Sequence, residues 1–561
     1  MERRLKGIPV SWGVGYGRPV SLTVSLGEGV DYKGVEAERA LLEAKSKLLA
    51  ELDELKKDAP RDVAEILEAH KLMVEALVDE AVGEVRGGRS ALEALAVVFE
   101  KYKELLESSG AALTQLKVED LIEIRDSLAG LLRGAGGVNI GEGSVLVAVE
   151  VYPSQLLRLA RRGLKAVIAE KGSYTSHAAI IARSLGVPAV FGVRDAVRSL
   201  STASLVVVDG FTGLVIADPG EDTLRKLMAR KQAFDELSKK FMEVKGKLAS
   251  TRDGRRITVA ANIGGEDDLN TALMNGAEGV GLFRVEFYYL GASSPPPVEK
   301  LAEVFARMAE KLEGKPLVIR LLDVGGDKPL PYMPAPRESN PFLGLRGIRL
   351  LFKYRGVLED QLKAVFKAAS RHSNIKVMAP MVSTLEEVRE LKKIIEEASR
   401  ELNVRVDFGI MVEVPSVVYM ADKIAREVDF LSIGTNDLTQ YIFAADRVNE
   451  NVSYLYDDMH PAVLRAIEVV SREAHRAGIP VHVCGELAGN PLAIPILVGL
   501  GVDELSVSPA LIPLVKWVVN GIEYTSSVKL AEEALKLDNG GEVREKARGF
   551  LSRELGVEIP W

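Results

Sequence analysis

Basic side chains gather at the ends of apolar runs in the C-terminal half of the sequence. The run GVGLFRVE contains one arginine near its end, and LVIRLLDV contains another and is followed by GGDK. A strand that only filled a core would end in Val, Ile or Ala, so these positions indicate a binding pocket. Guanidinium groups form paired hydrogen bonds with phosphate and carboxylate oxygens. We therefore predict a site for a small anion bearing both groups, lined by Arg284, Arg320, Arg346, Lys328 and Arg447. A lone arginine near a strand end can instead form a surface salt bridge.

Two carboxylates occupy matching positions in successive apolar runs. Glu413 ends FGIMVE, and Asp437 ends FLSIGTND directly after Asn436. Carboxylate oxygens that leave room for water and a substrate phosphate suit Mg²⁺. Alternatively, the two carboxylates simply pair with the neighbouring arginines. The recurrence of polar residues at most of these run ends favours a magnesium site.

The single cysteine of the chain, Cys484, lies near the end of the run VHVCGE. A free cysteine often serves as a small buried hydrophobe. Beside a cationic pocket, however, its thiol can act as a general acid and donate a proton to an enolate. The sequence leaves both interpretations open.

A second candidate site lies in the stretch KGSYTSHAAI, where His177 follows a small polar loop and precedes an apolar helical pattern. A histidine at a helix start can be a cap or a packed ring. The N-terminus of a helix also favours a phosphoryl group, through its free N–H groups and positive dipole end. A neutral imidazole is a competent nucleophile near pH 7. Thr175 and Ser176 add hydroxyl groups, and Arg183 adds a positive charge on the same helix.

Strand and helix patterns alternate throughout the C-terminal half. Eight strand–helix units predict a (β/α)₈ barrel, in which the active site lies at the carboxyl ends of the strands. The eight predicted strands are residues 256–263, 279–286, 317–324, 376–381, 408–413, 430–437, 481–486 and 504–509.

The hydrophobic pattern of the N-terminal half changes twice along the sequence. Short β-rich runs occupy its beginning and its end, and between them apolar residues recur every three or four positions, which is typical of amphipathic helices. We predict an α/β domain over 1–32 and 136–219, with a helical bundle inserted at 33–135. A charged helix at 220–250 would link this domain to the barrel at 251–561.

The composition is typical of a soluble globular protein. Hydrophobic residues make up 47% of the 561 positions, and the net charge of −8 argues against a general nucleic-acid binder. One cysteine permits no intrachain disulfide, and no run of about 18 apolar residues occurs. These features, together with an N-terminus that lacks an apolar signal segment, predict a cytoplasmic protein without membrane spans.

Taken together, the motifs resemble those of one family. The runs TSHAAIIARSLGVPAV, GVGLFRVEF, VGGDKPLPYM, NPFLGLRGIR, GIMVEVP, FLSIGTNDLTQY and CGELAGN are similar to Enzyme I of the phosphoenolpyruvate-dependent sugar phosphotransferase system, the phosphoenolpyruvate-protein phosphotransferase family. The similarity covers nearly the whole chain, including its order of domains. It implies a multidomain enzyme whose swivelling phosphohistidine domain carries the inserted bundle.

The resemblance also implies residue roles. His177 would accept the phosphoryl group of phosphoenolpyruvate, and Cys484 would protonate the enolate of pyruvate. Glu413 and Asp437 would bind Mg²⁺. Substrate would contact Arg284, Arg320, Arg346, Lys328, Asn436 and Arg447. The bundle would dock the histidine-phosphorylated carrier HPr, and the barrel would form a homodimer.

Two other functions fit some of these motifs. Pyruvate phosphate dikinase and phosphoenolpyruvate synthase share the phosphohistidine and barrel domains, but this chain has no room for their nucleotide-binding domain. A non-catalytic sensor of phosphoenolpyruvate would not need the intact catalytic positions. One departure from the family is Ser173, which follows Gly172 where a second glycine is usual.

Overall fold

The computed structural model describes residues 2–21, 31–57, 61–109, 114–133, 143–172, 177–289, 294–325, 330, 332–333, 338–447, 449, 452–557 and 559. The chain divides into two compact units, residues 1–235 and residues 236–559. They are called the N-terminal unit and the C-terminal unit below. Lys328, Thr175, Ser176 and Ser173, all named in the sequence analysis, lie outside the described residues.

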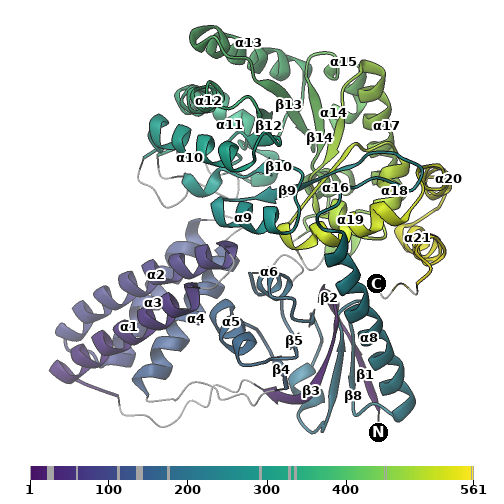
Figure 1. The fold of residues 1–561 in the computed structure, drawn as a ribbon. Coiled ribbons are helices and arrows are strands. Elements are labelled where there is room, and N and C mark those ends of the chain that lie inside the picture. Colours follow the sequence, from purple (N-terminus) through teal and green to yellow (C-terminus); the bar gives the residue numbers. More distant parts are fainter. Residues whose placement is uncertain are drawn as a thin grey trace. The chain divides into compact units, whose positions relative to one another are not determined.

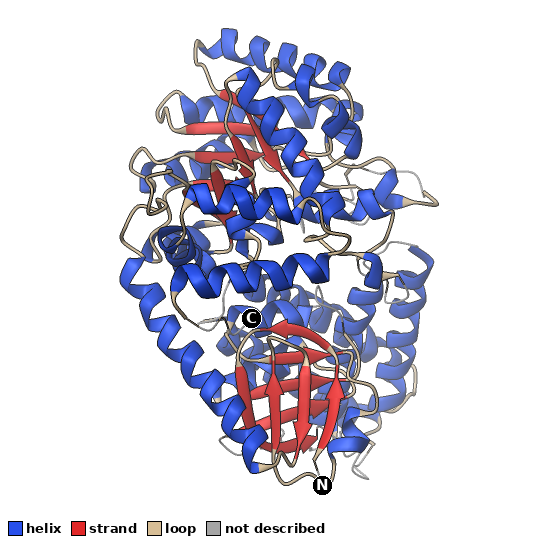
Figure 2. Cartoon of the chain, turned by 90° about the vertical axis from the view of Figure 1, so that its right-hand side faces the viewer, coloured by secondary structure: helices blue, strands red, loops and turns tan. Residues whose placement is uncertain are grey.

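The N-terminal unit is built on an eight-stranded sheet with the order β1-β8-β7-β3-β4-β5-β6-β2 (Figure 2, red strands). The neighbouring strands β3, β4, β5 and β6 run parallel to one another, and all other pairs in the sheet are antiparallel. The strands are β1 Arg3–Lys6, β2 Ile8–Ser11, β3 Val14–Ser21, β4 Ser144–Ala148, β5 Ala166–Ala169, β6 Ala189–Phe191, β7 Val206–Asp209 and β8 Leu214–Ala217.

The two faces of this sheet pack against different cores, because successive side chains of a strand point to opposite faces. Leu146 and Ala148 of β4 belong to a core shared with the helical bundle and with two helices of the α/β part, α5 (Pro153–Arg161) and α6 (His177–Ser184). Val145 and Val147 belong to a second core, completed by α7 (Ala196–Leu200).

Four helices lie between β3 and β4 in the sequence, and they form the bundle (Figure 1, purple). They are α1 Gly34–Lys56, α2 Arg61–Arg86, α3 Ala91–Ser109 and α4 Thr114–Leu132. In α1 the side chains of Leu41, Leu48, Leu52 and Leu55 are buried. Their spacing of three, four and seven residues places them on one side of a helix. Gly88, with φ of 102°, separates α2 from α3 in a conformation that glycine adopts readily.

Helix α8 (Glu221–Val244) runs from the N-terminal unit into the C-terminal unit. Leu227 packs with Val14, Val207 and Ile216 of the sheet. An ion pair of 2.7 Å between Nη1 of Arg230 and Oδ2 of Asp209 adds to this contact. The first half of α8 is therefore fixed to the sheet.

Eight parallel strands close into a barrel in the C-terminal unit, with the order β10-β11-β12-β13-β14-β15-β16-β9. The strands are β9 Thr258–Ile263, β10 Val280–Phe283, β11 Leu317–Arg320, β12 Ile375–Ala379, β13 Asp407–Val412, β14 Phe430–Ile433, β15 Val481–Val483 and β16 Glu504–Val507. Six of them lie within the predicted runs, whereas β12 and β13 each begin one residue before the corresponding run. The predicted fold class, an α/β domain with an inserted helical bundle, a linking helix and a (β/α)₈ barrel, is confirmed, whereas the predicted domain boundaries stay predictions.

Helices surround the barrel (Figure 1, teal to yellow). They are α9 Glu266–Met274, α10 Val298–Lys311, α11 Ile348–Lys353, α12 Arg355–Ala369, α13 Leu385–Leu402, α14 Pro415–Tyr419, α15 Ala421–Ile424, α16 Thr435–Phe443, α17 Pro461–Ala477, α18 Ile494–Gly499, α19 Ile512–Gly521, α20 Tyr524–Ala534 and α21 Gly540–Leu555. A buried cluster joins successive strands and contains Leu282, Val318, Met378, Met411, Phe430 and Cys484. Within the described part of the chain, no helix has the length and hydrophobicity that a bilayer span requires.

Candidate active site

The closed parallel barrel brings the polar run ends together at one face. Since all eight strands run in the same direction, their carboxyl ends share one rim. Arg320 is the last residue of β11, whereas Arg284, Glu413 and Cys484 directly follow β10, β13 and β15. Asn436 and Asp437 lie in the first turn of α16, which begins two residues after β14.

Arg346 connects two carboxylates at this rim. Its Nε and Nη2 donate to Oδ1 and Oδ2 of Asp323 at 3.1 and 3.0 Å. Nη1 and Nη2 also lie 3.3 Å from the two oxygens of Asp437. Burial lowers the pKa of the Arg346 guanidinium, but the negative charges of Asp323 and Asp437 raise it by more. The guanidinium therefore stays protonated and positively charged. The fork geometry therefore fixes Asp437 relative to the end of β11.

Arg320 is buried beside a carboxylate that the sequence analysis did not select. Its Nη2 donates to Oε1 of Glu286 at 2.9 Å, and the same oxygen accepts the backbone N–H of Asp323 at 3.0 Å. Burial lowers the pKa of Arg320, whereas Glu286 and Asp323 raise it, and the net effect is upward. Arg320 thus remains a cation in a position with little access to water.

Glu413 is the most deeply buried carboxylate of the rim, with 1% of its surface exposed. Its Oε1 accepts the N–H of Met381 at 2.5 Å. Burial raises the pKa of Glu413 to about 8, and the negative charges of Asp437 and Asp323 add to this rise. A buried carboxylate with negative neighbours fits a divalent cation, because oxygen ligands and excess negative charge are what Mg²⁺ requires.

The loop after β15 packs closely against the start of α16. Oδ1 of Asn436 accepts the N–H of Glu486 at 2.9 Å. A side chain at Gly485 would collide with Thr435, so this approach requires glycine. The contact holds Cys484 beside the rim, with Asn436 on the adjoining loop.

Cys484 is 3% exposed, and its Sγ lies 3.7 Å from the carbonyl oxygen of Ile433. Burial raises the pKa of its thiol to about 11. The group is therefore protonated at neutral pH and able to act as an acid.

This pKa gives an expectation for chemical modification. At pH 8, we expect iodoacetamide to alkylate Cys484 at least about 100-fold more slowly in the native chain than in urea, because a shift from 9.0 to about 11 lowers the thiolate fraction by that factor. Mass spectrometry measures the rate without ambiguity, since the chain has one cysteine. Equal rates would contradict a buried thiol.

The same shift predicts a pH dependence of stability. The folded chain keeps the proton of Cys484 to higher pH than the unfolded chain. This contribution to stability is fully present below pH 9 and decreases as the pH rises toward about 11.

Two of the predicted basic residues are more accessible. The side chain of Arg284 is exposed, and that of Arg447 is partly buried. The backbone N–H of Arg447 donates to Oε1 of Gln440 at 3.3 Å, which ties its segment to α16. Accessible cations suit contact with a diffusing substrate.

In the N-terminal unit, His177 is the first residue of α6, as its helix-start motif predicts. Arg183 lies in the last turn of the same helix, and its Nη1 approaches the carbonyl oxygen of Val10 at 3.5 Å. His177 and the barrel rim therefore belong to different units.

Comparisons with known proteins agree with this arrangement. Three family models match: "PEP-utilising enzyme, N-terminal" over residues 6–115, "PEP-utilising enzyme, mobile domain" over 140–213, and "PEP-utilising enzyme, PEP-binding domain" over 238–524. A protein of Priestia megaterium named phosphoenolpyruvate-protein phosphotransferase is 38% identical, over 91% of this chain and 92% of the relative. A protein of Geobacillus stearothermophilus with the same name is 36% identical, over 97% of this chain and 97% of the relative. A protein of Bacillus subtilis with that name is also 36% identical, over 96% of this chain and 98% of the relative.

The chain belongs to the PEP-utilising enzyme family. The resemblance inferred from the motifs is thereby confirmed, and the matched models follow the order of bundle, α/β part and barrel. The PEP-binding model covers the barrel rim with its arginines and carboxylates, and the mobile-domain model covers α6.

Three side chains that position the rim of this PEP-utilising enzyme were not among the predicted site residues. They are Glu286, Asp323 and Gln361. Glu286 and Asp323 lie close to arginines in the predicted strand runs. This proximity in the sequence could have been used to predict that they pair with arginines at the rim. Gln361 is fully buried on α12, where its Oε1 accepts the N–H of Leu322 at 3.0 Å and its Nε2 donates to the carbonyl of Arg320. It lies far from any site motif, so the sequence contained no signal for it.

Proposed function

We propose that the chain transfers the phosphoryl group of phosphoenolpyruvate to His177, releases pyruvate, and passes the group on to a histidine of an HPr-like carrier protein. The observation that carries this proposal is the barrel rim, where the buried cations Arg320 and Arg346 lie among carboxylates and a protonated thiol. The family models and the printed names of near full-length relatives support the same activity.

The proposed residues have complementary tasks. Arg320, Arg346 and Arg284 neutralise the phosphate of the substrate, and Lys328, Asn436 and Arg447 complete its binding. An imidazole nitrogen of His177 forms a bond to phosphorus as the bond between phosphorus and the enol oxygen breaks. The electron pair of that bond leaves with pyruvate enolate, and Cys484 supplies the proton that its methylene carbon takes up. The resulting thiolate regains a proton from water.

Glu413 and Asp437 are the proposed ligands of Mg²⁺. When bound, this ion would neutralise charge on the phosphoryl oxygens. The arginines and α6 would stabilise the remaining charge, since preorganised donors are most effective where water is excluded. Thr175, Ser176 and Arg183 are proposed to support the loop that holds the phosphohistidine.

The two units imply a mobile carrier. His177 must reach the barrel rim to receive the phosphoryl group and must reach the acceptor to deliver it. We infer that the N-terminal unit changes its orientation through α8, which connects the units. Docking of HPr at 33–135, dimerisation through the barrel and a cytoplasmic location stay predictions.

The test is a labelling experiment with the full chain. Incubation with ³²P-phosphoenolpyruvate and Mg²⁺, without nucleotide, is expected to release pyruvate and to give an acid-labile, base-stable label that maps to His177. Addition of a purified HPr-like protein is expected to move the label to that protein.

Three results would contradict the proposal in whole or in part. Label on another residue would reject the role of His177, and labelling that requires ATP would indicate a synthase or dikinase. Label on His177 that no HPr-like protein removes would reject the acceptor while leaving the first transfer intact.

A further inference from the structure

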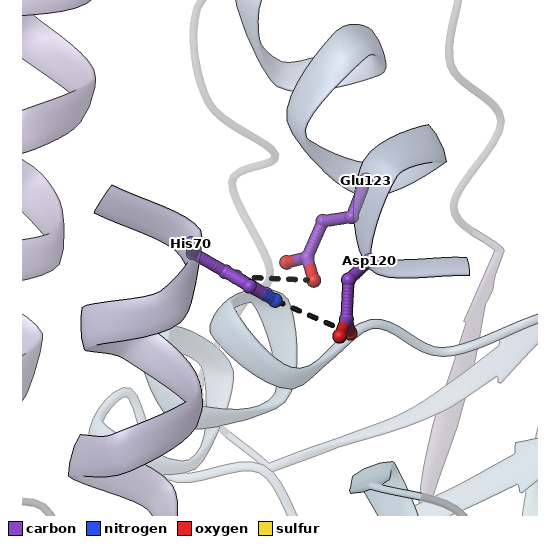
Figure 3. A group of neighbouring side chains, drawn as sticks. All are labelled: His70, Asp120 and Glu123. Carbon is purple, nitrogen blue, oxygen red and sulfur yellow. Dashed lines mark ion pairs between the residues drawn. The ribbon is translucent and has the colours of Figure 1, made fainter. Parts of the chain in front are cut away.

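A second group of buried titratable side chains lies inside the N-terminal unit. His70 projects from α2, and Asp120 and Glu123 project from α4 toward it (Figure 3). The three side chains are 1%, 6% and 2% exposed. Asp120 and Glu123 are three residues apart, which places both on the same side of the helix. None of them takes part in the proposed phosphoryl transfer.

The two carboxylates face different nitrogens of the His70 ring. Nε2 of His70 lies 3.2 Å from Oδ1 of Asp120, but it makes no well-directed hydrogen bond within the described residues. Nδ1 of His70 lies 3.8 Å from Oε2 of Glu123, which is longer than a hydrogen bond. One ligand atom from each side chain lies within 4.8 Å of the others.

Glu123 has the asymmetric environment of a ligand. Both the backbone N–H and the hydroxyl of Ser154, at the start of α5, donate to its Oε1. Its Oε2 is buried and has no hydrogen-bond partner among the residues that the structure describes. Metal-binding carboxylates are commonly oriented by such hydrogen bonds to the oxygen that faces away from the ion.

Protonation alone does not balance the charges and hydrogen bonds of these three side chains. A protonated His70 between two carboxylates would leave one net negative charge in a dry interior, which is costly. A proton on Oε2 of Glu123 would find no acceptor within hydrogen-bond distance among the described residues. A divalent cation with neutral His70 and two carboxylates gives zero net charge, and Nε2 of His70 and Oε2 of Glu123 would be among its ligands.

We propose that His70, Asp120 and Glu123 bind one divalent transition-metal ion, with Zn²⁺ as the best-suited species. One imidazole and two carboxylates form a donor set that Zn²⁺ accepts with ligand distances of about 2.0–2.2 Å. The three donor atoms lie within 4.8 Å of one another, so small side-chain rotations would bring them to this geometry. The ion would join α2, α4 and α5 and so fix the bundle to the sheet. The proposal does not depend on the proposed phosphoryl transfer.

The test measures binding of Zn²⁺ alone to the full chain after removal of metals with EDTA. Titration calorimetry uses the Glu413→Gln background, which removes the candidate cation site of the barrel. One equivalent is expected to bind, and His70→Gln is expected to weaken this binding at least about 100-fold, since it removes a direct ligand. His372→Gln serves as the matched control, because His372 lies beside α12 in the other unit, and no change is expected.

X-ray absorption of the zinc-loaded chain provides a reading that needs no variant. A single imidazole and oxygen ligands without sulfur are expected. The proposal is overturned if the metal-free chain binds no Zn²⁺, or if the His70→Gln chain binds it as tightly as its parent. Should His70→Gln fail to fold, Glu123→Gln is judged by the same criterion.

Discussion

Replacing His177 by alanine is expected to abolish phosphorylation of the chain and to leave phosphoenolpyruvate binding unchanged. The proposed nucleophile lies on α6 in the N-terminal unit, whereas the cations and carboxylates that would bind the substrate belong to the C-terminal unit. Acid-labile ³²P incorporation should fall to background, because no other group supplies the attacking nitrogen. Titration calorimetry with phosphoenolpyruvate and Mg²⁺ should give the wild-type dissociation constant.

The matched control for this experiment is His372→Ala. His372 lies just after α12 and has no place in the proposed transfer. This variant should incorporate label at the wild-type rate. Persistent label in the His177→Ala chain would exclude His177 as the acceptor, and loss of substrate binding would show that the variant acts on the barrel as well.

Replacing Arg346 by methionine is expected to reduce both turnover and stability. Methionine keeps much of the volume but leaves Asp323 and Asp437 without their shared partner. Breaking a buried ion pair on one side costs about 3–5 kcal/mol, because the remaining charge stays buried. Turnover should fall about 100- to 1,000-fold, since Arg346 would also stabilise charge on the phosphoryl group.

Two measurements separate these effects. Urea unfolding in metal-free buffer reports the stability, and pyruvate release at a temperature where the variant is folded reports the turnover. Arg355→Met is the control, because Arg355 pairs with Glu359 and Glu390 at the surface and should show no measurable change. Native stability in Arg346→Met would mean that the network of Arg346 contributes little.

The strands of the barrel were predictable because their signal is local. Each is a short apolar run, and the eight runs agree with β9 to β16. The shared position of Arg320, Glu413 and Cys484 followed from one further rule, since parallel strands in a closed barrel end at the same rim. These residues could be grouped without knowledge of any distance.

The pairing within the rim was not predictable from the sequence. Arg346 lies outside the strands, 23 residues after Asp323 and 91 residues before Asp437, and yet it contacts both. Because a guanidinium suits a phosphate, its residue type alone predicts that it binds the substrate. Which carboxylates it meets depends on how its segment packs against the strand ends, and that is a property of the whole barrel.

In the bundle, too, the helices were predictable from the local sequence, whereas the contacts between them were not. Apolar spacing along α2 and α4 predicted helices, because each helical turn repeats that pattern within a few residues. It gave no sign that His70 would meet Asp120 and Glu123. The sequence by itself determined the elements, the order in which they occur and the strand ends that share a rim. Only the tertiary structure decided which charges pair, because the distance between two side chains on different elements is set by the packing of those elements.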